Sequence, residues 1–308
     1  MASAAQEIRI LFKGPGDRLF VTYKPLGWYL SAPPGKTKCG NSLAAIIAAK
    51  LGFTAECIKF SSKLGLNQRG LVIGATDDGM YNQLNRYVEQ GLCTKTYKCI
   101  IRANNMYNVW SDGEFPMKQA LKRFSYRYGS SEGTINFHLH KCPDTLSLRS
   151  LGNDLGNYIR LGSSKTKSQF ISKSSAVYAR VCKEDGPHRM EYRITNLRDH
   201  LRKLMEEENI EMPKGVNYSQ FRLLEIKISD NTVDRHLLEI MSSLGIDPVG
   251  MPSTRLKFLE HVGVKHYQNG LLMELCEIEL PHPIYKMKTI QVRMSNEDFS
   301  KFLHLLNH

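Results

Sequence analysis

A short apolar run with turn residues behind it constrains the fold of this chain more than any other segment. Residues 71–76 read Leu-Val-Ile-Gly-Ala-Thr, a nearly continuous apolar stretch that is typical of a buried strand. The Asp-Asp-Gly of residues 77–79 then predicts a turn into a helix over about 80–90, which Gly91 ends. Residues 95–101 are rich in β-forming side chains and predict a second strand. This order of elements indicates a fold that mixes strands with helices.

The segments on either side extend this pattern with further strands and helices. The N-terminal part predicts a strand that begins at Leu19 and a helix over 43–51, with Asn41 or Ser42 as its cap and Gly52 at its end. The later predictions are a helix over 197–208, a strand over 224–228, a helix over 232–244, a hairpin turn at Asn269-Gly270 between strands over 260–267 and 271–280, and a last helix that begins at Ser295. We therefore predict an α+β fold with a mixed, mostly antiparallel sheet and flanking helices, as a single domain over 1–308.

Composition narrows the classes of partner. Lys and Arg total 42 against 30 Asp and Glu, a net charge of +12, which favours a polyanion such as nucleic acid, although surplus lysines also serve solubility alone. The longest apolar candidate, residues 43–51, is half the roughly 18 residues that a membrane-spanning helix needs, so no membrane partner is expected. Seven cysteines without a C-x-x-C pair argue against a disulfide scaffold and favour a reducing interior.

Two short motifs resemble ligand sites but lack necessary parts. The Pro-Pro-Gly-Lys-Thr of residues 33–37 has Leu30 where a phosphate-binding loop needs glycine. His138, His140 and Cys142 share one face of a strand, but same-face neighbours lie about 7 Å apart and cannot converge on one ion without a bend. Ordinary strand packing explains them better, and we expect neither a metal nor a cofactor.

Four segments, in order, resemble motifs of the pseudouridine synthases of the ribosomal type, which isomerise uridine in ribosomal RNA. These segments are Val21-Thr-Tyr-Lys-Pro-Leu-Gly27, the stretch from Ser62 to Gly79, Lys95-Thr-Tyr97, and the stretch from Asp234 to Val249. The resemblance implies a pseudouridine synthase-like fold, with insertions atypical of the family within 103–220. It leans toward the small-subunit branch, whose usual S4 module is not expected here because Lys24 leaves no room before it.

The resemblance also implies a mechanism that this chain lacks a residue to perform. In the family, an aspartate attacks a uridine that has been flipped out of the RNA, and no metal or cofactor replaces that carboxylate. Gly65 stands at the position of this aspartate, whereas Tyr97 matches the tyrosine that stacks on the flipped base. Asp77 and Asp78 follow a strand of roughly 20 Å and therefore lie at its wrong end. We expect no catalytic residue.

Several residues at the matching positions are candidates for RNA contact. They are Lys24, Lys63, Asn67, Arg69, Tyr97 and Arg235. For each charged residue the alternative is an ordinary solvated surface charge, and for Tyr97 it is packing in the core. The paired family arginines near the C-terminus correspond to Leu238 and Glu239, so this part of the basic site is reduced. Basic and aromatic residues interleave over 102–128, which fits RNA stacking and an exposed strand equally well.

These observations favour a catalytically inactive, RNA-binding protein that serves as a ribosomal RNA scaffold or assembly factor, with ribosomal or assembly-factor proteins as neighbours. Diverged synthases in mitochondrial ribosome assembly favour the mitochondrion by analogy, while the cytosol and nucleolus stay open. One alternative is an active synthase with a displaced carboxylate, which predicts an Asp or Glu within a few ångströms of the Tyr97 hydroxyl. Another is a structural subunit that binds only proteins.

Overall fold

A single mixed sheet organises the part of the chain that the structure describes. The structure is a computed structural model, and it describes residues 8–32, 41–62, 64–65, 68–102, 132–141, 158–161, 177–182, 188–208, 217–235, 237–238, 241, 248–250, 271–285 and 287–295. Along the sheet the strands follow the order β1-β2-β4-β11-β5-β10-β9-β6-β8-β7, with β12 added beside β11 and β3 beside β4. Among these pairs β4 and β11 run parallel, and the others run antiparallel.

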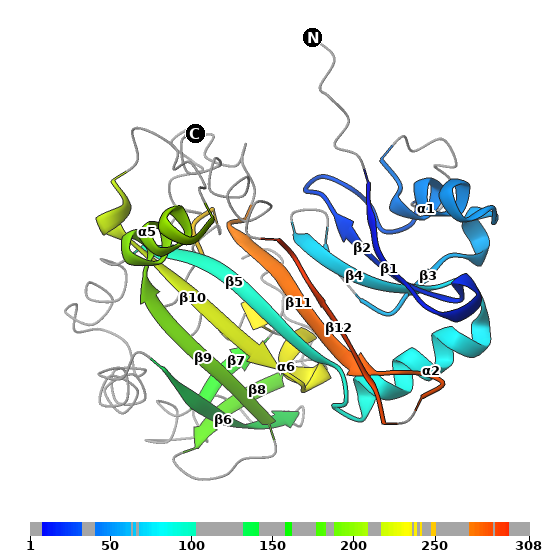
Figure 1. Cartoon of the computed structure of the whole chain (residues 1–308). Coiled ribbons are helices and arrows are strands. Elements are labelled where there is room, and N and C mark those ends of the chain that lie inside the picture. Colours follow the sequence, from blue (N-terminus) through cyan, green and yellow to red (C-terminus); the bar gives the residue numbers. More distant parts are fainter. Residues whose placement is uncertain are drawn as a thin grey trace, which may run out of the picture.

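The elements have the following bounds. The strands are β1 Ile10–Lys13, β2 Leu19–Lys24, β3 Lys59–Phe60, β4 Arg69–Ala75, β5 Thr94–Arg102, β6 Glu132–Lys141, β7 Tyr158–Leu161, β8 Val177–Cys182, β9 His188–Asn196, β10 Phe221–Ile228, β11 Met273–Pro281 and β12 Thr289–Arg293. The helices are α1 Leu43–Leu51, α2 Asp78–Glu89, α5 Leu197–Glu208 and α6 Asn231–Arg235, with short 3-10 turns η1 Pro15–Asp17, η2 Ala55–Cys57 and η5 Tyr218–Gln220. Figure 1 shows α1 and α5 near opposite ends of the sheet.

Strand β4 is buried along its whole length because helices cover both of its faces. Leu71 and Ile73 point to one face and belong to the same core cluster as Leu84 of α2. Val72 points to the other face and packs in a second cluster with Ile47 of α1. Alternate side chains of a strand point to opposite faces, so a strand covered twice needs apolar residues at every position. This arrangement explains the continuous apolar run of residues 71–76.

Gly70 permits the close approach of β4 to β11. Its backbone has φ +125°, a conformation that side chains disfavour. A Cβ atom at this position would lie 2.4 Å from the backbone nitrogen of Leu275, the residue that pairs with Gly70 in the parallel ladder. The β4–β11 junction therefore depends on a residue without a side chain.

Helix α5 covers β5 and β10 on one face of the sheet, and α6 packs on the other face. Ile100 of β5 and Leu223 of β10 pack against Leu201 of α5 in a separate core cluster. On the opposite face, Ile226 of β10 belongs to the main cluster together with Val233 of α6. Because side chains along a strand alternate between the two faces of the sheet, the odd-numbered side chains of β5 point toward α6 and the main cluster.

The predicted fold class is confirmed, since the sheet is mixed, mostly antiparallel and flanked by helices. The predicted helices over 43–51 and 197–208 match α1 and α5, and Gly52 takes the left-handed conformation that ends α1. Helix α2 begins two residues earlier than predicted because Asp77 is its N-cap and accepts a hydrogen bond from the Met80 amide. The Asn269-Gly270 turn, the basic and aromatic stretch over 103–128 and the helix expected after Ser295 lie outside the described residues.

Candidate functional site

Two polar side chains of β5 meet one carboxylate of α6. Lys95 and Tyr97 lie two residues apart and therefore on the same face of β5. The Tyr97 hydroxyl donates a hydrogen bond to Oδ1 of Asp234 at 2.6 Å, and the Lys95 ammonium donates one to Oδ2 at 2.6 Å. Both carboxylate oxygens of Asp234 are thereby occupied by donors from neighbouring positions of one strand.

The position of Asp234 depends on how α6 begins. Asp230 precedes the helix, and its Oδ1 accepts hydrogen bonds from the backbone amides of Thr232 and Val233 at 2.7 and 3.2 Å. The other oxygen of Asp230 contacts Nδ1 of His188 on β9. This N-cap satisfies amides that a helix otherwise leaves unpaired, and it fixes the first turn, which carries Asp234.

The Asp234 cluster is largely withdrawn from solvent. The side chains of Lys95 and Asp234 are 6% and 14% exposed, and Tyr97 is 6% exposed. Burial raises the pKa of Tyr97 well above its usual value, and the negative charge of Asp234 raises it further. The hydroxyl of Tyr97 therefore keeps its proton at neutral pH and acts as a hydrogen-bond donor to the carboxylate.

Gly65 lies in a turn that lines the same cleft. Its amide donates to Oε1 of Gln68 at 2.7 Å, and the Gln68 amide donates back to the Gly65 carbonyl at 3.1 Å. Among the described residues, a Cβ atom at Gly65 would meet only that Oε1 atom within 4 Å, at 3.4 Å, and φ of Gly65 is not in the left-handed region. Neither backbone strain nor crowding by the described residues thus requires glycine here.

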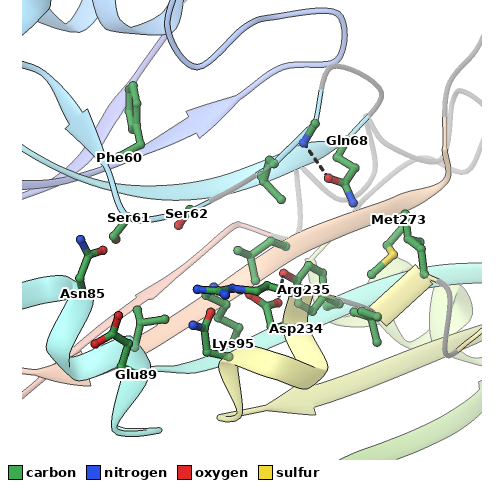
Figure 2. A pocket seen from close by; sticks show the side chains of 18 of the residues that line it. Phe60, Ser61, Ser62, Gln68, Asn85, Glu89, Lys95, Asp234, Arg235 and Met273 are labelled. Atoms are coloured by element: carbon green, nitrogen blue, oxygen red, sulfur yellow. Dashed lines mark hydrogen bonds and ion pairs between the residues drawn. The ribbon is translucent and has the colours of Figure 1, made fainter. Parts of the chain in front are cut away.

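The cleft between these elements has a volume of about 620 Å³, which falls within the range of about 300–1,000 Å³ typical of ligand sites. Figure 2 shows Asn85 and Glu89 of α2 on one side and Asp234 and Arg235 of α6 on the other, with Lys95 between them. Among the described residues, the charged lining comprises two acidic and two basic side chains. This described lining is close to electrically balanced, in contrast to the chain as a whole.

Two of the predicted RNA contacts are buried instead, which corrects the expectation for them. Lys24 is completely buried, and its ammonium donates to the backbone carbonyls of Gln68 and Pro25 at 2.6 and 3.3 Å. Burial, together with a smaller effect of the nearby charge of Arg69, lowers the pKa of Lys24 to about 8. Arg69 is also buried, and this burial lowers its pKa. Lys24 holds the turn that contains Gly65, and neither group offers a surface to phosphate.

The other predicted contacts differ in their placement. Arg235 is exposed and lines the cleft, and the edge of Tyr97 lines it too although the ring belongs to the main core cluster. Lys63 and Asn67 lie outside the described residues. Only Arg235 and Tyr97 among the described candidates therefore border the same cavity as Gly65.

The acidic residues that follow β4 serve α2 and not the cleft. Asp77 accepts two hydrogen bonds from Arg18, at 2.7 and 2.9 Å, and this pairing lowers the pKa of Asp77 to about 2. Asp78 pairs with Lys59. Neither aspartate lines the cleft, in agreement with their predicted place at the far end of the strand.

Sequence reasoning missed Asp234 as a member of the site. Asp234 is 137 residues beyond Tyr97 in the sequence, so it does not stand out among the carboxylates close to Gly65 in the chain. One signal was present in the motif that begins at residue 234, where this chain has aspartate and the family has asparagine. A new acid at a position next to the expected active site is a reason to consider it as a partner of the retained Lys95 and Tyr97.

Among the described residues, no cluster of three or more histidine, cysteine or acidic side chains is arranged to hold a metal ion. Residues 138 and 140 lie within β6, and Cys142 lies outside the described part. No helix in the described part is both long and apolar enough to cross a membrane.

Comparison with solved structures agrees with the fold derived above. Human RNA pseudouridylate synthase domain containing 1 superposes with a TM-score of 0.51 over 97% of this chain and 90% of its own, at 11% identity. Human RNA pseudouridylate synthase domain containing 4 gives a TM-score of 0.49 over 97% and 92%, at 16% identity. No protein-family model and no curated protein matches the sequence. The chain therefore has a pseudouridine synthase-like fold.

Proposed function

We propose that this protein binds RNA through a pseudouridine synthase-like cleft and does not catalyse isomerisation of uridine. The observation that carries this proposal is that Gly65 lines the cleft, and the sequence resemblance assigns Gly65 to the position of the family nucleophile. Because glycine has no side chain, it supplies no carboxylate to attack a ribose or a base. The room beside Gly65 means that the loss of this carboxylate is not imposed by packing.

The state of the carboxylate that lies beside Tyr97 supports the same conclusion. Asp234 gives one oxygen to Lys95 and the other to Tyr97, each at 2.6 Å. A nucleophile must leave such partners to reach a substrate atom, and doing so would expose a buried ammonium group without its counter-charge. Since the Tyr97 ring is only 6% exposed, it also offers little area for a base to stack on.

RNA is the partner that best fits the charge and the fold. The chain has a net charge of +12, and phosphate is the usual complement of such an excess. The name of the first structural neighbour identifies that protein as an RNA pseudouridylate synthase domain protein. Arg235 at the edge of the cleft is exposed and available to a phosphate.

Ribosomal RNA is the proposed client, and assembly of a mitochondrial ribosome is the proposed setting. The support is the resemblance of four sequence segments to synthases of ribosomal RNA, together with the existence of diverged synthases in such assembly systems. Ribosomal or assembly-factor proteins would then be the neighbours of residues 103–220. Crosslinking in cells followed by RNA sequencing tests this setting, because it identifies both the RNA and its compartment.

Binding and chemistry can be measured on the same RNA. We expect the purified chain to bind structured ribosomal RNA with an affinity that falls steeply as salt increases. We also expect no release of tritium from RNA labelled on the uracil ring, whereas an active synthase under the same conditions releases it. Binding that is absent or independent of salt would overturn the proposal and favour a subunit that contacts only proteins.

An active enzyme is the second candidate, and one distance favours it. An enzyme with a displaced carboxylate requires an acid close to the Tyr97 hydroxyl, and Asp234 lies 2.6 Å from it. In that case Asp234 would be the nucleophile, and a uridine entering the cleft would displace it from Tyr97.

The two candidates separate when single carboxylates of the cleft are neutralised. If the chain forms pseudouridine, Asp234→Asn should abolish the product while Glu89→Gln, at the opposite wall, retains it. Product from the Asp234→Asn variant would exclude Asp234 as the nucleophile. If the unaltered chain binds an RNA but forms no pseudouridine in it, the active enzyme is excluded and the non-catalytic function stands.

A further inference from the structure

Helix α2 has a second polar face, which turns away from the cleft. Tyr81, Asn85 and Glu89 follow one another at helical spacing and line the cleft. The other side of the helix lines a shallow groove of about 550 Å³, which we call the outer groove. Its lining residues are Gly79, Asn82, Gln83, Arg86, Tyr87 and Gln90.

The turn between β11 and β12 continues the outer groove. We call residues 282–285 and 287–288 the hairpin tip; Figure 1 shows this turn beside α2. The Gln83 side-chain amide donates to the backbone carbonyl of Pro283 at 3.0 Å and to the Tyr87 hydroxyl at 2.8 Å. The hydrogen bond from Gln83 to Pro283 joins the groove and the tip into one surface, and the bond to Tyr87 orients the Gln83 side chain that makes it.

The hairpin tip presents an aromatic ring in an ordered setting. Nδ1 of His282 accepts hydrogen bonds from the amides of Ile284 and Tyr285, at 3.1 and 3.0 Å. The centres of the His282 and Tyr285 rings lie 4.7 Å apart. The Lys288 ammonium lies 5.1 Å from the centre of the Tyr285 ring. Tyr285 is nevertheless 55% exposed. A preordered, exposed aromatic ring beside a cation is the arrangement on which unpaired bases stack.

The charge of this surface differs from that of the cleft. As far as the structure describes it, the lining of the outer groove contains Arg86 and no acid, and the tip adds Lys288. Glu89 faces the cleft, and Asp77 and Asp78 at the start of α2 are already paired with Arg18 and Lys59. The outer groove therefore has a local positive charge, which the balanced cleft lacks.

We propose that the outer groove and the hairpin tip form a second RNA-contact surface, which takes a single-stranded or loop segment. A base stacks on Tyr285, the adjoining phosphates lie near Lys288 and Arg86, and the amides of Asn82 and Gln90 donate to sugar or phosphate oxygens. The inference rests on the proposed RNA binding and adds where unpaired RNA is held. RNA in the cleft and RNA on this surface would then contact two different faces of α2.

Two variants and a matched control test this surface. Against an RNA with a single-stranded segment, Tyr285→Ala should weaken binding by about tenfold, as expected for the loss of one stacked base. Arg86→Ala/Lys288→Ala should weaken binding and reduce the slope of log affinity against log salt by about 1.4, since each phosphate contact to a single strand contributes about 0.7. Arg202→Ala/Lys203→Ala removes the same charge from exposed positions of α5 and should leave the slope nearly unchanged.

The outcomes distinguish this inference from the proposed function. If the unaltered chain shows no salt-dependent RNA binding, the proposed function fails. If it binds RNA and both surface variants behave like the α5 control, RNA binding stands and the second surface is excluded. Because the altered side chains are exposed, thermal unfolding should give nearly the same midpoint for all variants. A fully paired duplex should be affected less by Tyr285→Ala than the single-stranded RNA, and equal losses would contradict stacking.

Discussion

Asp234 and Lys95 form an ion pair whose partners are both mostly buried. The side chains are 14% and 6% exposed, so water screens neither charge effectively. Removing one member of such a pair leaves the other charge buried and uncompensated, while replacing both by apolar groups avoids this penalty. The stability of the cleft therefore depends on the pair as a unit.

Substitution of one member should accordingly cost more than substitution of both. Asp234→Ala should lower the free energy of unfolding by about 3 kcal/mol, because Lys95 then lies in a buried site without its counter-charge. Lys95→Met/Asp234→Leu should recover most of that loss, which urea denaturation of the set of variants measures. Losses that simply add in the double variant would show that the two charges do not interact.

The buried ammonium of Lys24 makes stability depend on alkaline pH. Its pKa is lowered from 10.5 to about 8, mainly by burial. Between these pH values the unfolded chain holds a proton that the folded chain has released, so this group by itself makes the free energy of unfolding rise with pH across this window. We expect the contribution of Lys24 to be a rise of about 1–3 kcal/mol, since one pKa unit corresponds to about 1.4 kcal/mol.

The comparison with Lys24→Met isolates this contribution. The raised pKa values of Tyr97 and of the thiols of Cys93, Cys99 and Cys276 act in the opposite direction, because the unfolded groups lose their protons first, but they act equally in both proteins. The difference in unfolding free energy between the two proteins should therefore change between about pH 8 and pH 10.5. Curves that stay parallel across this range would contradict a lowered pKa for Lys24.

At the scale of elements, two glycines near the cleft differ in whether the fold needs a residue without a side chain at their positions. Gly70→Ala would force a Cβ atom to 2.4 Å from the Leu275 backbone at a φ of +125°. Because backbone cannot move aside as a flexible side chain can, the β4–β11 ladder should be disrupted, at a cost of about 3 kcal/mol or more. Gly65→Ala meets only one side-chain oxygen, at 3.4 Å, and should change stability by less than about 0.5 kcal/mol. Denaturant midpoints of the two variants test this contrast, and equal losses would refute it.

The elements that sequence reasoning predicted are those with a strong local pattern. Strand β4 has a continuous apolar run, and α1 has a capping position and a terminal glycine, so their positions follow from nearby residues. The strands β6, β7 and β8 belong to a region in which polar and charged residues obscure the alternation. Their pairing with β9 and with one another joins segments far apart in the chain, and no local pattern encodes such partners.

The residues of the site likewise fall into those with a local sequence signal and those whose placement depends on the tertiary fold. Tyr97 could be predicted because its strand motif is short and contiguous. The burial of Lys24 could not be predicted, since it results from the turn at Gln68 closing over β2. The Asp234 pair likewise exists only after α6 has packed beside β5, which is a property of the tertiary fold.

At the scale of the whole molecule, one hydrophobic cluster extends across the sheet from β2 to β9. It includes Leu19 of β2, Leu71 of β4, Ile226 of β10 and Val292 of β12. Elements that share a core tend to unfold together. The strands that contribute to this cluster should therefore behave as one cooperative unit.

Hydrogen exchange with two matched core variants measures that cooperativity. Leu71→Ala in β4 and Ile226→Ala in β10 each remove a buried side chain from the same cluster, and each should lower the free energy of unfolding by about 2–5 kcal/mol. In a single unit, either substitution lowers the protection of the slowest amides in β4, β11, β5 and β10 by the same amount, because those amides exchange only when the whole sheet opens. If Leu71→Ala instead affected only β2 and β4, and Ile226→Ala only β5 and β10, the sheet would consist of two units that open separately at the β4–β11 junction.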